Sequence, residues 1–258
     1  AKYDTNGQLV KEYPIRNEHG GASISGFCES RNHEIIISVW NGRVYHLDKE
    51  KDEFIPYPDK MRSRNPTVMV QDNEQDYFWL ATWGDGVVRF DPSAPGDSMF
   101  VYSEIPVNAA GEEDGLILSL AQDDKLGYIW LTTGHDFMAL QIQPDRTLKQ
   151  LKFPAGLLPV NHMLVEVLKG KECLWVSAFD RPSFILHLMD NITKDYALPA
   201  LADRVNRSPA IMALCDDGDG MMWMMQERTG LALYDLKQDK VKIYSDFPAL
   251  ASLPLNNG

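Results

Sequence analysis

The sequence is poor in cysteine and has no long apolar run. Its three cysteines, Cys28, Cys173 and Cys215, are an odd number at no metal-like spacing, which excludes a complete internal disulfide framework. Each lies in an apolar stretch, where a free cysteine behaves as a small buried hydrophobe. Because no run of 18 or more apolar residues exists, we expect no membrane-spanning helix.

Basic residues are scarce relative to acidic ones. Lysine and arginine number 25 against 37 aspartates and glutamates, which gives a net charge of -12. A nucleic-acid partner requires clustered cations, and so does contact with an anionic membrane surface, so we expect neither partner. A neutral or cationic ligand meets no general electrostatic barrier.

An apolar run with one central residue recurs along the chain. This anchor defines five repeats, numbered here in chain order: Ile36, Trp79, Trp130, Trp175 and Trp223. Successive anchors lie 43, 51, 45 and 48 residues apart. Repeats of this length are typical of propeller blades.

Other residues keep fixed distances from the anchors. An acidic residue stands seven positions before four of them: Glu29, Asp72, Asp123 and Asp216. An aspartate stands twelve positions after three of them: Asp48, Asp91 and Asp235. We expect the anchor tryptophans to fill the space between sheets, and we expect Asp91 and Asp235 to shape turns by bonding their own backbone. Both sets are assigned to structure.

Each repeat divides into four short strands, which the second repeat illustrates best. Its expected strands run over 68–71, 78–82, 87–90 and 100–102, with Gly84-Asp85-Gly86 as one of the separating turns. Four strands per repeat is the count of a propeller blade. No segment shows a helical apolar period with caps at both ends, so the sequence predicts an all-β chain, a β-propeller, with little helix.

The pattern reaches both ends of the chain. Tyr3-Asp4 matches Phe90-Asp91, and 253–256 matches the approach to Trp175, so we expect both ends to lie inside a repeat. One propeller segment over 1–258 is predicted, with five complete four-stranded antiparallel blades and terminal fragments. Its pieces are 1–20, 21–60, 61–106, 107–156, 157–200, 201–250 and 251–258. Such a segment should pack on further blades of a longer parent chain or self-associate.

The second repeat carries the clearest motif. From Trp79 to Pro92 it reads Trp-Leu-Ala-Thr-Trp-Gly-Asp-Gly-Val-Val-Arg-Phe-Asp-Pro, which resembles the signature of the two-component regulator propeller repeat. Such repeats form the periplasmic sensor region of hybrid two-component histidine kinases in Bacteroides-type bacteria, followed by an immunoglobulin-like unit, one membrane helix and kinase modules. The resemblance implies a non-catalytic periplasmic sensor segment that contributes to oligosaccharide recognition and to signal transmission.

Ligand contacts are expected in the turns between the second and third strands, which share one face of a propeller with the connections between blades. The contents of these turns vary while the flanking strands keep their pattern, and such loops often carry specificity. The candidate residues are Trp40, Asn41, Trp83, Asp85, His135, Asp136, Phe179, Asp180, Arg181, Glu227 and Arg228. In one interpretation the aromatic residues stack on sugar rings and the polar ones bind hydroxyl groups. In the other, the aromatics pack between neighbouring blades and the charged residues are solvated.

Two other functions stay open at this point. A propeller enzyme of the lyase or glycan-degrading type needs convergent catalytic groups, and only His135 and His162 among six histidines fall on the expected ligand face. No histidine pair has a metal-like spacing such as His-x3-His, so we expect no catalysis, no metal ion and no other cofactor. The second alternative is a scaffold that binds another protein.

Overall fold

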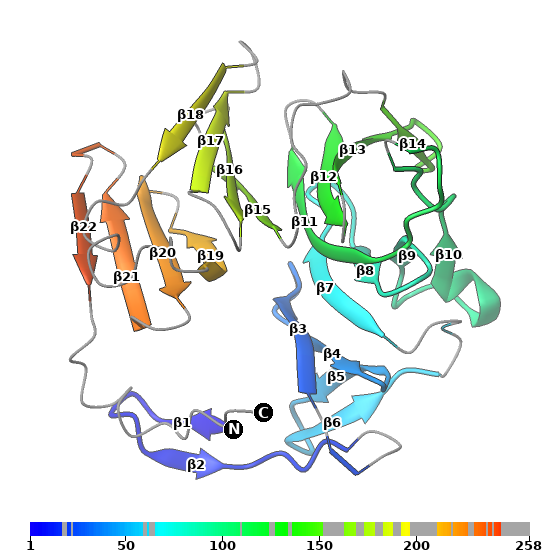
Figure 1. The fold of residues 1–258 in the computed structure, drawn as a ribbon. Coiled ribbons are helices and arrows are strands. Elements are labelled where there is room, and N and C mark those ends of the chain that lie inside the picture. The colour runs from blue at the N-terminus through cyan, green and yellow to red at the C-terminus, as the bar shows by residue number, and fades with distance from the viewer. Residues whose placement is uncertain are drawn as a thin grey trace. The chain divides into compact units, whose positions relative to one another are not determined.

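The computed structural model of the chain consists of short antiparallel strands joined by turns (Figure 1). It describes residues 1–16, 20–21, 23–58, 61, 65–108, 110–123, 127–133, 136–151, 163–168, 173–178, 183–187, 192–196, 211–217, 219–226, 230–235, 237–238 and 240–243. The chain divides into two units, one of Ile15–Val167 and one of Ala1–Pro14 with Leu168–Gly258. Among the described residues, no helix is long and apolar enough to cross a membrane.

Three four-stranded sheets make up the unit 15–167, each a meander in chain order. The first contains β3 (Ser23–Glu29), β4 (Ile35–Trp40), β5 (Val44–Asp48) and β6 (Glu53–Pro56). The second contains β7 (Pro66–Gln71), β8 (Phe78–Thr82), β9 (Val87–Phe90) and β10 (Phe100–Tyr102), with the one-turn 3-10 helix η1 (Gly96–Met99) before β10. The third contains β11 (Ile117–Asp123), β12 (Tyr128–Thr133), β13 (Phe137–Ile142) and β14 (Leu148–Gln150). The first strands β3, β7 and β11 contact one another in that order, as the inner strands of successive propeller blades do.

The other unit repeats the same sheet type. Two short strands, β1 (Lys2–Tyr3) and β2 (Leu9–Lys11), pair at its N-terminal end. A four-stranded meander follows with β15 (Met163–Leu168), β16 (Cys173–Ala178), β17 (Ser183–His187) and β18 (Ile192–Tyr196), of which β15 reaches the unit only with its last residue. The last meander contains β19 (Ile211–Asp216), β20 (Met221–Gln226), β21 (Gly230–Asp235) and β22 (Lys240–Ile243).

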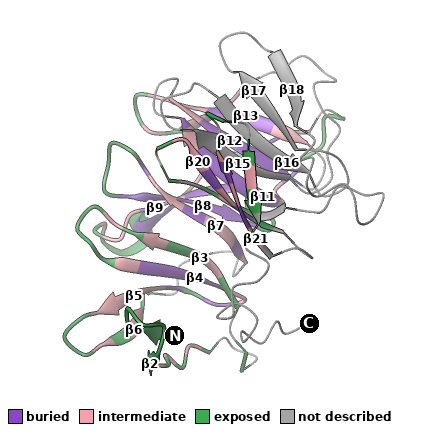
Figure 2. Cartoon of the chain, turned by 90° about the vertical axis from the view of Figure 1, so that its left-hand side faces the viewer, coloured by how far each residue is buried: buried purple, intermediate pink, exposed green. Residues whose placement is uncertain are grey.

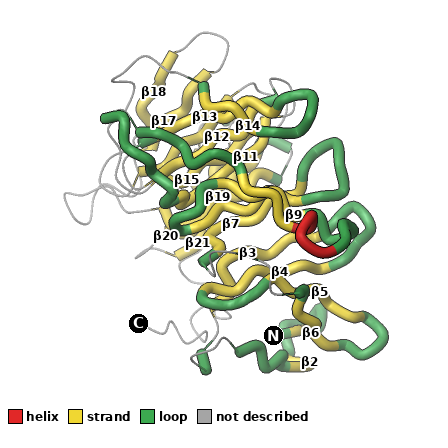
Figure 3. The backbone as a smooth tube through the Cα atoms, turned by 90° about the vertical axis from the view of Figure 1, so that its right-hand side faces the viewer, coloured by secondary structure: helices red, strands yellow, loops and turns green. Residues whose placement is uncertain are grey.

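The strands of the second repeat lie where the sequence predicts them. β8, β9 and β10 have the expected bounds, and β7 begins two residues early, at Pro66. Within the described residues η1 is the one helix, red in Figure 3. The prediction of an all-β chain of blade-like sheets is therefore confirmed. A count of five complete blades in one propeller is not supported, because the sheets fall into two separate units.

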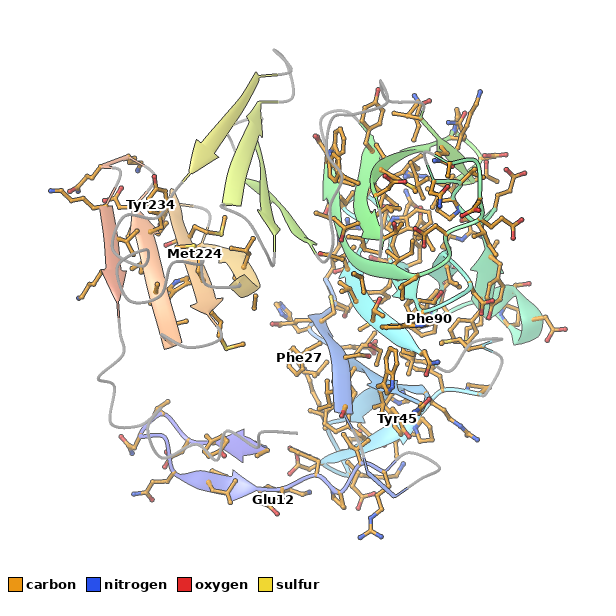
Figure 4. The ribbon with its side chains drawn as sticks, in the orientation of Figure 1. Glu12, Phe27, Tyr45, Phe90, Met224 and Tyr234 are labelled. Carbon is orange, nitrogen blue, oxygen red and sulfur yellow. The ribbon has the colours of Figure 1, made fainter. Side chains whose placement is uncertain are left out.

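Strand β8 is buried on both faces, which explains its unbroken apolar sequence (Figure 2). Trp79 and Ala81 face a cluster that they share with Ile117 and Leu131 of the third sheet. Phe78 and Leu80 face the other way, toward the first sheet. On that side Phe90, labelled in Figure 4, stacks on Phe100 with ring centroids 5.0 Å apart. Each such buried side chain contributes about 1.5–3 kcal/mol of hydrophobic stabilisation.

The acidic residue seven positions before the anchor binds the anchor indole. In the second repeat the Trp79 Nε1–H donates to Asp72 Oδ2 at 2.9 Å, and both residues are fully buried. In the third repeat Trp130 and Asp123 form the same pair at 3.5 Å. The first repeat has Ile36 as its anchor and no indole N–H, and there Glu29 instead contacts His33 Nδ1 at 2.6 Å. The seven-residue spacing therefore reflects a structural hydrogen bond across one hairpin.

The aspartate twelve positions after the anchor closes the following turn. Asp91 Oδ1 accepts from the backbone N–H of Ser93 at 3.0 Å, and Asp235 Oδ1 accepts from that of Lys237 at 2.8 Å. Asp48 does the same with the N–H of Glu50. The structural assignment of Asp91 and Asp235 is confirmed.

The expectation of buried cysteines is wrong at one position. Cys215 is exposed on β19, Cys28 is half-buried on β3, and the side chain of Cys173 lies outside the described residues. On β19 the exposed residues Ala213 and Cys215 lie on one face of the strand, because side chains alternate between faces. An apolar run alone does not reveal which face of its strand is left open.

Candidate functional site

The predicted site lies in the turns that join the second and third strands of each sheet. Five of the candidate residues are described: Trp40, Asn41, Trp83, Asp85 and Asp136. The remaining candidates lie outside the described residues: His135, Phe179, Asp180, Arg181, Glu227 and Arg228. The five described candidates all belong to the unit 15–167, so the described part of the predicted site lies on its three sheets.

A threonine three positions after the anchor shapes the turn of the second repeat. Thr82 is fully buried, and its Oγ1 donates to the Gly86 carbonyl at 2.9 Å. The same oxygen accepts from the backbone N–H of Asp85 at 3.0 Å. The turn also places Gly84 at φ +124° and Gly86 at φ +69°, which side chains rarely tolerate. The Gly-Asp-Gly sequence therefore follows from the backbone that this turn adopts.

The neighbouring turns are variants of this arrangement. In the third repeat the Asp136 N–H donates to Thr133 Oγ1 at 2.9 Å, as the Asp85 N–H does to Thr82. In the first repeat valine replaces the threonine, and Asn41 takes a positive φ of 52° in a tight turn with Gly42. A threonine at the third position after the anchor is thus the sequence signal for this turn.

Two of the predicted aromatic residues meet across neighbouring sheets. The indoles of Trp40, at the end of β4, and Trp83, which follows β8, lie edge to face with centroids 5.3 Å apart at 83°. Trp83 nevertheless keeps 47% of its surface exposed. Packing between sheets and an open aromatic face therefore coexist here, and both interpretations of these residues stay open.

The Trp83 turn is also bonded to the connection that leads into β11. The N–H groups of Gly84 and Gly86 both donate to the Gly115 carbonyl, at 2.8 and 3.2 Å, and Trp83 bridges to Leu116. A Cβ atom on Gly115 would lie 2.2 Å from the Gly84 carbonyl oxygen, so only glycine fits. Sequence reasoning missed Gly115, because nothing in its local sequence indicates a contact with another repeat.

Asp85 is the polar residue at the tip of this turn. Its side chain is half-buried, and its Oδ2 atom is inaccessible and has no hydrogen-bond partner among the described residues. The same part of the chain holds no group of three or more histidine, cysteine, aspartate or glutamate residues that could bind a metal ion. The turn thus combines an open indole with a half-buried carboxylate two residues away, and these kinds of group occur in sites for neutral ligands that carry hydroxyl groups.

Comparison with known proteins gives a match at the level of fold. No family model matches the chain, and no curated protein does. The chain is similar to the extracellular domain of the putative hybrid two component system BT4673 from B. thetaiotaomicron, with 14% identity and a TM-score of 0.60, over 86% of this chain and 27% of that one. It is similar to the corresponding domain of BT3049, with 14% identity and a TM-score of 0.57, over 85% of this chain and 29% of that one.

A third similar structure is an enzyme. Catalytically inactive virginiamycin B lyase from Staphylococcus aureus, crystallised with quinupristin, matches with 16% identity and a TM-score of 0.64, over 89% of this chain and 70% of the lyase. The chain spans less than a third of the length of the two Bacteroides domains. At these identities the likeness establishes the fold alone: the chain shares the blade-like sheets of the extracellular domains of Bacteroides hybrid two-component systems, as its repeat motif predicted.

Proposed function

We propose that the chain is a periplasmic sensor segment of a hybrid two-component receptor and that its sheets serve as propeller blades. The observation that carries the proposal is the fold likeness to two Bacteroides extracellular domains of such systems. The Trp79-to-Pro92 motif supports it independently, because it resembles the propeller repeat of those sensors. In this role the segment is non-catalytic, and it recognises an oligosaccharide-like ligand and passes the signal to the rest of the receptor.

The ligand surface in this proposal is the face that carries the turns between second and third strands. Its aromatic part is the Trp40–Trp83 pair, of which Trp83 is 47% exposed. An apolar ring face of this kind suits the C–H face of a sugar, and nearby carboxylates suit its hydroxyl groups. Backbone bonds from Gly84 and Gly86 to Gly115 fix the turn in advance, which lowers the entropic cost of binding.

The direct test is a thermal-shift screen of the purified chain against neutral oligosaccharides. A specific ligand raises the melting temperature by mass action, and the shift grows with ligand concentration. Replacing Trp83 by alanine should abolish the shift. The matched control is Val101→Ala, which removes another exposed apolar side chain, on β10, and should keep the shift. If no saccharide stabilises the wild-type chain, or if both variants respond alike, the proposed role of this face is wrong.

A lyase is the second candidate, and the likeness to virginiamycin B lyase is the observation that favours it. The histidines that sequence analysis associates with such chemistry, His135 and His162, lie outside the described residues. Incubation of the chain with quinupristin, followed by mass spectrometry, separates the candidates. Turnover that is lost on replacing either histidine would favour the lyase over the sensor.

A further inference from the structure

Seven aspartates in the turns of this chain share one hydrogen bond. At seven positions the side chain accepts a hydrogen bond from the backbone N–H two residues further on: Asp4, Asp48, Asp72, Asp91, Asp145, Asp217 and Asp235. This bond is the physical reason why aspartate is common in turns. Each of these carboxylates has a local structural function that needs no ligand.

Asp85 also lies in a turn, and no such bond forms there. Its backbone N–H is engaged with Thr82 Oγ1, but its carboxylate closes no turn, and Oδ2 is buried without a partner in the described part of the chain. A carboxylate oxygen that loses water without gaining a donor destabilises the folded protein. The buried, unpartnered Oδ2 atom distinguishes Asp85 from these seven aspartates, and this atom calls for a separate explanation.

The surrounding backbone prevents the Asp85 turn from relaxing. Thr82 Oγ1 bonds the turn at both Asp85 and Gly86, and the Gly115 carbonyl holds Gly84 and Gly86 from the side. The backbone of the turn that carries Asp85 is therefore fixed, and Trp83, two residues earlier, keeps 47% of its surface exposed. A carboxylate on a fixed turn, two residues from an open indole, supplies the two kinds of group that a saccharide site uses.

We infer that Asp85 accepts a hydrogen bond from a hydroxyl group of a neutral saccharide that stacks on Trp83. This inference rests on the proposed function. In the free protein the Oδ2 atom of this carboxylate has no donor among the described residues. In the complex, a small rotation of the side chain lets a sugar hydroxyl donate to it while the indole covers the apolar face of the same sugar. Asp85 therefore lowers the stability of the free chain and raises the affinity for the ligand.

Substitutions at Asp85 should consequently move stability and affinity in opposite directions. Asp85→Ala removes the unpaired carboxylate, so the melting temperature of the free chain should rise by about 2–4 °C. The same variant should bind the saccharide at least about tenfold more weakly, because a charge-assisted hydrogen bond is lost. The matched control is Asp91→Ala, which removes an aspartate that does close its turn. It should melt lower than the wild type and bind with unchanged affinity.

The probes are cellotetraose, mannotetraose and xylotetraose, titrated by calorimetry, with chitosan tetraose and tetramethylammonium chloride as cationic probes. Higher stability with weaker binding in Asp85→Ala, together with intermediate affinity in Asp85→Asn, supports the inference. If the wild type binds a saccharide and Asp85→Ala binds it equally well or melts lower, this inference alone is overturned. If the cationic probes bind and the neutral ones do not, the carboxylate binds an ammonium group and the assigned ligand class is wrong. A wild-type chain that binds no saccharide overturns the proposed function together with this inference.

Discussion

Replacing Asp72 by alanine removes a buried carboxylate that joins the second and third repeats. Asp72 Oδ2 accepts from the Trp79 indole at 2.9 Å and lies 3.8 Å from Arg146 Nη1 and 3.4 Å from Gln122 Nε2. Asp72 Oδ1 accepts from two backbone N–H groups of the turn that follows, including that of Glu74 at 2.9 Å. One side chain thus contacts an anchor, a turn and two residues of the third repeat.

The expected loss follows from these bonds. Removing the carboxylate leaves the buried Trp79 N–H without an acceptor, which costs about 1–3 kcal/mol, and the bonds from the turn to this charged group contribute about 1.5–3 kcal/mol more. Arg146 also loses one of its two acidic partners, since it keeps its ion pair with Glu74. We therefore expect Asp72→Ala to lower the free energy of unfolding by about 3–5 kcal/mol, out of roughly 5–15 kcal/mol for a typical domain.

Urea denaturation followed by circular dichroism measures this loss as a lower midpoint at unchanged slope. Asp91→Ala is the matched control, because Asp91 closes a turn without binding an indole, and its loss should be about 1 kcal/mol. Asp72→Asn should fall between the two, since its amide oxygen still accepts from Trp79. If Asp72→Ala and Asp91→Ala lose the same amount, the carboxylate–indole bond does not explain the spacing of the repeat.

Three further predictions concern the turns and the core. Gly115→Ala should destabilise the chain by about 1–3 kcal/mol and speed hydrogen exchange at Gly84, because the new Cβ would lie 2.2 Å from the Gly84 carbonyl oxygen. Gly21→Ala, which meets no atom within 4 Å, should do neither. Thr82→Val should cost about 1–2 kcal/mol in urea denaturation, since the fully buried hydroxyl makes two turn bonds, and an unchanged midpoint would contradict this. Burial raises the pKa of Tyr77 from 10.0 to about 12, so the folded chain keeps a proton that the unfolded chain releases between these values. The free energy of unfolding should therefore fall as the pH rises from 10 to 12. Tyr77→Phe should remove up to about 3 kcal/mol of that fall. Equal pH profiles of the free energy of unfolding for the wild type and the variant would contradict this prediction.

Sequence spacing by itself determined the blade-like sheets, the strands of the second repeat and the structural aspartates. The reason is that the bonds behind these features are local. Asp72 and Trp79 lie on either side of one hairpin, and Asp91 binds a backbone group two residues away. A local bond needs a fixed number of residues between its partners, so it leaves a constant offset that can be read from one sequence.

The tertiary structure alone decided which candidates form a site and how they do so. Trp40 and Trp83 belong to different repeats, and no offset along the chain predicts that their indoles meet edge to face. Gly115 supports the Trp83 turn from the connection before β11, and the lack of a partner for Asp85 Oδ2 among the described residues depends on every group that surrounds it. Contacts between repeats depend on how the sheets stack, and an alternating apolar pattern specifies which residues are buried without specifying which neighbours they contact.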